Sequence, residues 1–261
     1  MTESDSLLTR TTATLRRDFL ALWLTAAWPY FLVGICFTLI GAVYRATHDP
    51  AIQISPLDLW QALGPLDKFG IDAAFLISVV VPRDLATAGV AMKVWAKLDG
   101  EPMDWPLFLS RFGRVLPRLL VLSLALGLVC SLAGFLFILP GIVLAVFTSF
   151  AIPVLVIQDT TISSALRTGF TLAKTQFGRL LLLWVITVLL GCAGLLGMIG
   201  AMALAPARSD SLPRWMTGAA FWVGISIVAS LCILIRATVT THLYQDAVAR
   251  RGETFVTPVQ S

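Results

Sequence analysis

The sequence predicts an all-α fold, a polytopic membrane bundle of six transmembrane helices arranged as three hairpins, with amphipathic helices at the cytoplasmic interface. Three observations lead to this prediction. First, 57% of the 261 residues are hydrophobic and 13% are charged, and the mean hydropathy is +0.86, a balance that soluble domains of this size do not have. Second, four stretches of 21 to 40 residues contain no Asp, Glu, Lys or Arg. Third, the basic residues fall mainly on one side of the membrane when the chain crosses it six times.

Five spans follow directly from the charge-free stretches, because about 20 helical residues cross the hydrocarbon core of a bilayer. The longest stretch has 40 residues, enough for two spans, and Pro140 and Gly141 near its middle predict a hairpin turn. Pro153 lies inside the span that follows and predicts a kink there. A further span is interrupted by Arg83 and Asp84. The six spans are expected at about residues 19–44, 75–98, 118–139, 141–158, 180–206 and 215–236.

The distribution of Lys and Arg decides between five and six spans and orients the chain. With six spans, fourteen basic residues lie in the two tails and the even-numbered connections. Five spans with the same N-terminal orientation put fourteen basic residues outside, which violates the positive-inside rule. We therefore expect both termini in the cytoplasm, with residues 1–245 forming the six-helix domain and residues 246–261 a short cytoplasmic tail. The basic residues of the odd-numbered connections are Arg45, Lys68, Arg208 and Arg214.

Two amphipathic segments, about residues 105–116 and 162–177, precede the third and fifth spans. Each places apolar side chains at helical spacing with basic side chains opposite, which is typical of a helix in the headgroup layer. Both end in Phe-Gly-Arg, and residues 7–19 are a fainter version. This pattern indicates either three repeated units or the amphipathic lead-ins that any polytopic protein needs. The second segment has the predicted apolar stripe Ile162, Leu166, Phe170, Ala173 and Phe177, and the basic residues predicted to bind lipid are Arg114, Arg167, Lys174 and Arg179.

The residue types that enzymes and metal sites need are scarce in this sequence. All four cysteines fall in apolar stretches, where cysteine packs as a small hydrophobic side chain. The two histidines, His48 and His242, are too few for a His-based metal cluster and lie outside the apolar cores of the spans. No polar segment exceeds about 30 residues, so we expect no separate catalytic domain. The sequence therefore predicts no enzyme activity, no cofactor, no metal and no nucleic-acid partner.

Arg83 and Asp84 are ionisable residues inside a predicted span, where each costs about 2.5 to 3.5 kcal/mol. If Arg83 faces the bundle interior with a partner on another span, it marks a site for a solute or a lipid headgroup. Alternatively, the span begins near Ser78 and both charges lie in the outer interface. Because adjacent helical residues point about 100° apart, we do not expect the pair to neutralise itself. Arg236 is expected to extend to the cytoplasmic interface from the end of the sixth span.

Four short segments within residues 119–190 resemble the sequence pattern of a known protein family. They are Leu139-Pro140-Gly141-Ile142, Ala151-Ile152-Pro153-Val154, Gln158-Asp159 and Ser164-Ala165-Leu166-Arg167. The sequence here resembles the YciC-like family of bacterial inner-membrane proteins and the membrane domain attached to some glycerophosphoryl diester phosphodiesterases. The resemblance implies a six-helix protein of the bacterial inner membrane. It does not imply phosphodiesterase activity, because in that family the activity resides in a separate barrel domain.

Two functions from different classes fit these features. The first is a non-enzymatic scaffold or envelope accessory protein that binds anionic membrane lipids, a membrane-protein partner or a second copy of the chain. The cytoplasmic-side basic residues support it, since each contributes about 1 kcal/mol near an anionic leaflet. The alternative is a small-solute or lipid transporter with a site near Arg83, Asp84 and the kinked fourth span. Close helix packing is predicted for the scaffold at a stripe of small residues in span five, Ala193, Gly197, Ala201 and Ala205.

Overall fold

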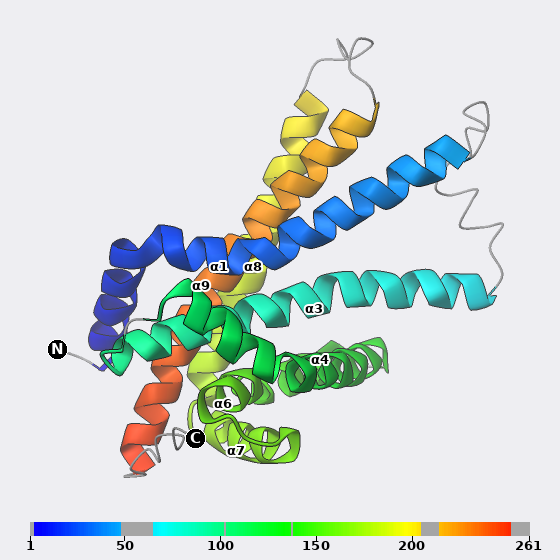
Figure 1. Ribbon diagram of the computed structural model, residues 1–261. Coiled ribbons are helices and arrows are strands. Elements are labelled where there is room, and N and C mark those ends of the chain that lie inside the picture. Colours follow the sequence, from blue (N-terminus) through cyan, green and yellow to red (C-terminus); the bar gives the residue numbers. More distant parts are fainter. Residues whose placement is uncertain (1–2, 48–64, 102, 137, 205–213, 252–261) are drawn as a thin grey trace.

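The computed structural model describes residues 3–47, 65–101, 103–136, 138–204 and 214–251. Within these residues all regular secondary structure is helical, so the predicted all-α class is confirmed. The helices are α1 (Glu3–Thr47), α3 (Pro65–Leu98), α4 (Trp105–Leu136), α5 (Ile138–Phe147), α6 (Ala151–Gln158), α7 (Ile162–Thr175), α8 (Phe177–Leu204) and α9 (Arg214–Arg251) (Figure 1).

Five helical segments of the described chain are long and apolar enough to cross a membrane, as expected of an integral membrane protein. They overlap the predicted spans one, three, four, five and six. The second predicted span lies in α3, which is not among the five. Six spans and their pairing as hairpins therefore stay predictions. The five segments are Leu7–Cys36, Trp105–Cys130, Pro140–Gln158, Phe177–Gly197 and Val223–Arg250.

The helices pack together at one end of the molecule and diverge at the other (Figure 1). α1, α3 and α9 contact one another, α4 and α6 lie against α3, and α8 runs along α9. The packed end is formed by the beginning of α1 and the ends of α3, α6 and α9. One apolar cluster there surrounds the fully buried Phe108 and Tyr244, and a second joins α1, α3 and α9 around Leu22 and Val90. Much of the apolar surface of α8 is exposed, which suits contact with hydrocarbon.

Two of the three amphipathic lead-in segments are separated from their span by a bend. α1 leaves helical geometry at Asp18 (φ −124°, ψ 19°), directly before Phe19. Gln176, between α7 and α8, has nearly the same conformation (φ −118°, ψ 17°) directly before Phe177. α4 instead runs unbroken through Phe112, so the lead-in before the third predicted span is continuous with that span and is not a separate helix.

The predicted hairpin turn at Pro140 and Gly141 falls within a helix. α4 ends at Leu136 and α5 begins at Ile138, so Pro140 and Gly141 lie in the first turn of α5 and not in the connection. Proline is tolerated there because the first N–H groups of a helix have no acceptor within it. Residue 137 lies outside the described residues.

A second interruption separates α5 from α6 at residues 148–150, one turn before Pro153. Proline has no N–H to donate to the carbonyl four residues earlier, which is that of Ser149. A kink in this region is what Pro153 predicts, and the structure places the interruption on the N-terminal side of the proline.

α8 packs against α9 on a different side from the predicted small-residue stripe. Ala193 and Gly197 are exposed, and a methyl carbon at Gly197 would meet no atom within 4 Å. α9 approaches at Gly194, where a methyl carbon would lie 2.5 Å from Cγ1 of Val228. The prediction is therefore wrong by one residue, about 100° of helix rotation. The side chains of the other two members, Ala201 and Ala205, lie outside the described residues.

The predicted apolar stripe of α7 matches its buried face except at Phe170. Ala173 is buried, and the larger apolar cluster is contacted by Ile162, Leu166 and Phe177. α7 packs on α6 at Gly169, where a methyl carbon would lie 2.8 Å from the backbone nitrogen of Ala151, so only glycine permits this approach. Phe170, a member of the predicted stripe, is 41% exposed, and its ring lies 4.7 Å from that of Phe147. The buried residues of α7 are Ala165, Gly169, Leu172 and Ala173.

α9 extends beyond the predicted end of the membrane domain. It continues to Arg251, so residues 246–251 of the predicted tail are helical, and Ala247 and Val248 are buried in the larger cluster. The rest of the predicted tail lies outside the described residues.

Candidate functional site

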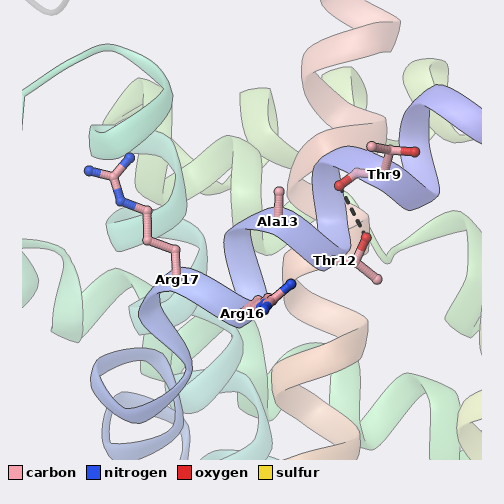
Figure 2. Close-up of a pocket in the computed structure, with 5 residues that line it drawn as sticks. All are labelled: Thr9, Thr12, Ala13, Arg16 and Arg17. Atoms are coloured by element: carbon pink, nitrogen blue, oxygen red, sulfur yellow. Dashed lines mark hydrogen bonds between the residues drawn. The ribbon is translucent and has the colours of Figure 1, made fainter.

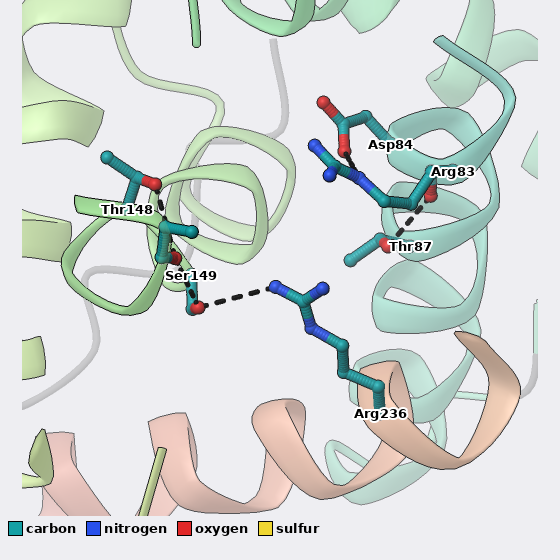
Figure 3. Close-up of polar contacts among 7 residues, drawn as sticks. Arg83, Asp84, Thr87, Thr148, Ser149 and Arg236 are labelled. Carbon is teal, nitrogen blue, oxygen red and sulfur yellow. Dashed lines mark hydrogen bonds and ion pairs between the residues drawn. The ribbon is translucent and has the colours of Figure 1, made fainter. Parts of the chain in front are cut away.

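Arg83 and Asp84 form an ion pair within α3 (Figure 3). Nε of Arg83 donates a hydrogen bond to Oδ1 of Asp84 at 2.8 Å. The expectation that these neighbours do not neutralise each other is wrong, because the long arginine side chain folds back over its own helix. The Asp84 side chain is 2% exposed and that of Arg83 is 37% exposed. Oδ2 of Asp84 has no hydrogen-bond partner in the described part of the chain.

Arg83 does not lie at the beginning of its helix. α3 begins at Pro65, thirteen residues before Ser78, the start assumed when both charges are placed in the outer interface. The helix continues to Leu98 on the other side. The ion pair therefore belongs to the middle of a long helix.

Arg236 reaches the same region from α9 (Figure 3). Its Nη2 donates to Oγ of Ser149 over 3.4 Å. α9 continues for fifteen residues beyond Arg236. That this arginine lies at the cytoplasmic interface stays a prediction. In Figure 3 the guanidinium groups of Arg83 and Arg236 point into the same space between α3, α9 and the interruption after α5.

The interruption between α5 and α6 supplies the hydroxyl groups of the site. Thr148 Oγ1 donates to the carbonyl of Leu144 at 2.9 Å, and Ser149 Oγ donates to the carbonyl of Ala145 at 2.8 Å. Each hydroxyl is thereby fixed on the last turn of α5, with its own oxygen left to accept a hydrogen bond. The oxygen of Ser149 accepts from Arg236 in this way.

The arginine cluster, which we define as Arg83, Asp84, Ser149 and Arg236, carries more positive than negative charge. Two guanidinium groups face one carboxylate, which leaves an excess of one positive charge. Guanidinium groups bind carboxylate and phosphate oxygens through paired, charge-assisted hydrogen bonds. The arrangement is therefore suited to one bound anionic group.

The four basic residues predicted to contact lipid lie outside the arginine cluster. Arg114 of α4 and Arg167 and Lys174 of α7 are exposed on helix surfaces. Nζ of Lys174 lies 4.8 Å from the ring centroid of Phe170. Arg179, at the start of α8, is half-buried, and its Nη1 donates to Oε1 of Gln176 over 3.5 Å. These residues form basic helix surfaces and not a pocket.

A separate group of polar contacts ties α1 to α9 at the packed end. Nη2 of Arg10 contacts both carboxylate oxygens of Asp246, at 2.9 and 3.0 Å. Thr14 Oγ1 lies 3.3 Å from Nε2 of His242. A wide hollow of about 610 Å³ opens beside these contacts on α1 (Figure 2). It is lined by one helix alone, through Thr9, Thr12, Ala13, Arg16 and Arg17, so it forms a surface depression.

Sequence reasoning did not assign Ser149 to the site. Ser149 has one usable signal, since it lies four residues before Pro153, where a proline opens the helix. Arg83 and Asp84 could be identified from the sequence, because charged residues inside a membrane span are rare.

The chain was compared with protein-family models, with curated proteins and with solved structures, and none of them matches it. The similarity to the YciC-like family stays a prediction.

Proposed function

We propose that this chain is a non-enzymatic, multi-pass protein of the bacterial inner membrane that binds an anionic lipid, with the lipid headgroup at the arginine cluster. The observation that carries the proposal is the second guanidinium group, Arg236, beside a pair that is already neutral. A cation without a matching anion is costly inside a membrane protein. A bound headgroup offsets that cost.

The exposure of the cluster favours a lipid over an enclosed ion. The side chain of Arg83 is 37% exposed whereas that of Asp84 is 2% exposed. A headgroup arriving from the side of the bundle would therefore meet the guanidinium group first. The exposed apolar faces of α4 and α8 provide surface for acyl chains, and the basic surface of α7 would attract anionic lipid to the same protein.

Transport of a small solute or a lipid is a second candidate function, favoured by one observation. The interruption between α5 and α6 places Ser149 against Arg236. Discontinuous helices at a binding site are a recurring feature of transporters, where they allow the site to open on either side. In the scaffold function the same interruption only shapes the site.

The substitution Arg236→Gln separates binding from stability. It removes the excess charge but leaves the Arg83–Asp84 pair intact, so we expect a thermal unfolding midpoint in detergent that is not lowered. Binding of phosphatidylglycerol, measured by native mass spectrometry, should weaken about tenfold or more, the effect of losing a charge-assisted hydrogen bond. Arg111→Gln, which changes an exposed arginine of α4, is the matched control and should bind as the unmodified chain does.

Two results would overturn this assignment. Equal phosphatidylglycerol binding by Arg236→Gln and Arg111→Gln would remove the arginine cluster from lipid recognition. Movement of headgroup-labelled phosphatidylglycerol between the leaflets of proteoliposomes, lost in Arg236→Gln, would replace the scaffold function by lipid transport.

A further inference from the structure

A charged cavity, separate from the arginine cluster, lies between α1, α3 and α4 at the bend of α1. Its volume is about 460 Å³, within the range of small-molecule sites. We call it the α1–α3–α4 cavity. Its charged and aromatic lining consists of Arg17, Asp18, Lys93, Lys97, Asp104 and Trp105.

Two of the three cations in this cavity lack an ion-pair partner among the described residues. Lys97 pairs with Asp18 across the α1–α3 contact. Lys93 has no carboxylate partner there, and its Nζ lies 3.7 Å from the ring centroid of Trp105. Arg17 likewise has no such partner, and it leaves α1 in a different direction from its neighbour Arg16 (Figure 2).

The cavity is distinct from the arginine cluster. Lys93 follows Arg83 by ten residues of α3, about 15 Å along the helix axis. The second apolar cluster lies in this interval, with Val90 and Ala86 fully buried against Leu22 of α1. A lipid headgroup bound in one site therefore does not contact the charged residues of the other.

The charge balance of the lining selects among anions. Three cations and two carboxylates leave one positive charge, which matches a phosphodiester, with its single negative charge. A phosphate monoester carries about −1.5 to −2 at neutral pH and would leave charge uncompensated next to the Asp104 carboxylate. Trp105 is 46% exposed, and an indole with one apolar face and one wet edge is typical of the membrane interface.

We propose that the α1–α3–α4 cavity binds the phosphodiester of a glycerophospholipid headgroup from the leaflet at the packed end. Lys93 and Arg17 contact the phosphate oxygens, and Trp105 packs against the glycerol region. The bend at Asp18 creates the site, because it turns α1 so that Arg17 and Asp18 face the end of α3. This site is additional to the one at the arginine cluster and does not depend on it.

The proposal is tested by measuring the binding of short-chain phosphatidylglycerol to the full chain in detergent. All variants carry Arg236→Gln, which weakens binding at the arginine cluster. Lys93→Gln and Arg17→Gln should each raise the dissociation constant about fivefold. The double variant should raise it further than either single variant. Arg16→Gln is the matched control and should leave binding unchanged. Thermal unfolding midpoints equal to that of the background confirm that each variant is folded.

Several outcomes would overturn the proposal. One is the loss of all phosphatidylglycerol binding in the Arg236→Gln background itself. Another is equal binding by Lys93→Gln, Arg17→Gln and Arg16→Gln. Competition with inorganic phosphate tests whether the cavity binds a soluble ligand instead. We expect inorganic phosphate not to displace the lipid even in large molar excess. Displacement that Lys93→Gln abolishes would reassign the cavity to free phosphate.

Discussion

The ion pairs at the packed end and the ion pair in the arginine cluster use the same chemistry in opposite ways. At the packed end, Arg10–Asp246 joins α1 to α9 and Lys97–Asp18 joins α3 to α1. Each matches one cation with one carboxylate and holds two helices together. Arg83 and Asp84 are neighbours on α3, so their pair joins no helices.

The difference separates charges that stabilise the helix packing from charges that do not. An ion pair that serves as a clamp is expected to cross between helices and to be neutral, and the pairs of the packed end meet both conditions. The arginine cluster meets neither, because Arg236 adds a second cation to a neutral pair. Its charges are therefore better explained by a ligand than by stability.

The largest expected effect distinguishes the two regions directly. Asp84→Asn leaves two guanidinium groups facing each other without a carboxylate. Removing one partner of a fully buried pair costs about 3 to 5 kcal/mol, and because Arg83 is 37% exposed we expect a loss of about 2 to 3 kcal/mol. The measurement is the free energy of unfolding in detergent. The double variant Asp84→Asn, Arg236→Gln should recover part of the loss, because one of the two uncompensated charges is gone.

Asp99→Asn is the control for this substitution, since Asp99 is an exposed aspartate just beyond the end of α3. It should change stability by less than about 0.5 kcal/mol. A mild effect of Asp84→Asn, equal to that of Asp99→Asn, would show that the cluster is solvated like the packed end, and the comparison would fail.

A smaller loss is expected at the clamp between α1 and α9. Asp246→Asn removes the charge of a pair whose side chains are 40% and 16% exposed, so solvent screens much of the interaction. We expect a loss of about 1 kcal/mol. Hydrogen exchange should become faster in residues 7–17 of α1 while the exchange of α3 is unchanged. Faster exchange throughout the bundle would show that this pair holds more than one helix.

The helical architecture was predictable from the sequence because hydropathy alone determines which segments enter a bilayer. The rotation of α8 about its axis was not. The small-residue stripe of α8 was predicted one residue away from Gly194, since only the position of Val228 on α9 decides which face is used. Periodicity describes one helix and contains no information on its neighbour.

The bends in the lead-in segments show the same limit. Phe112 and Phe177 stand in the same Phe-Gly-Arg pattern, yet the helix bends only before Phe177. α7 is held against α6 at Gly169, away from the line of α8, which gives a tertiary reason for the bend. α1 bends at Asp18 and is similarly held by α9 through Arg10.

Part of the arginine cluster was predictable, and the rest depended on packing. Charged residues inside a span drew attention to Arg83 and Asp84, and Pro153 indicated the interruption near Ser149. That Arg236 faces Ser149 follows from the contact of α9 with α6, which joins residues 87 positions apart. No local pattern encodes a contact of that separation.

The smallest expected effect concerns Arg118 and Asp159, a pair that connects α4 to the residue after α6. Nη1 of Arg118 lies 3.0 Å from Oδ1 of Asp159, and their side chains are 47% and 35% exposed. Because both partners remain largely hydrated, Arg118→Gln should lower stability by less than about 0.5 kcal/mol, and the difference should vanish at about 1 M salt. Unfolding of both proteins at low and high salt provides the measurement. Asp246→Asn, from the less exposed pair, should keep part of its effect at high salt. A loss from Arg118→Gln as large and as salt-resistant as that from Asp246→Asn would show that exposure does not rank the ion pairs of this protein, and the contrast with the arginine cluster would then need another cause.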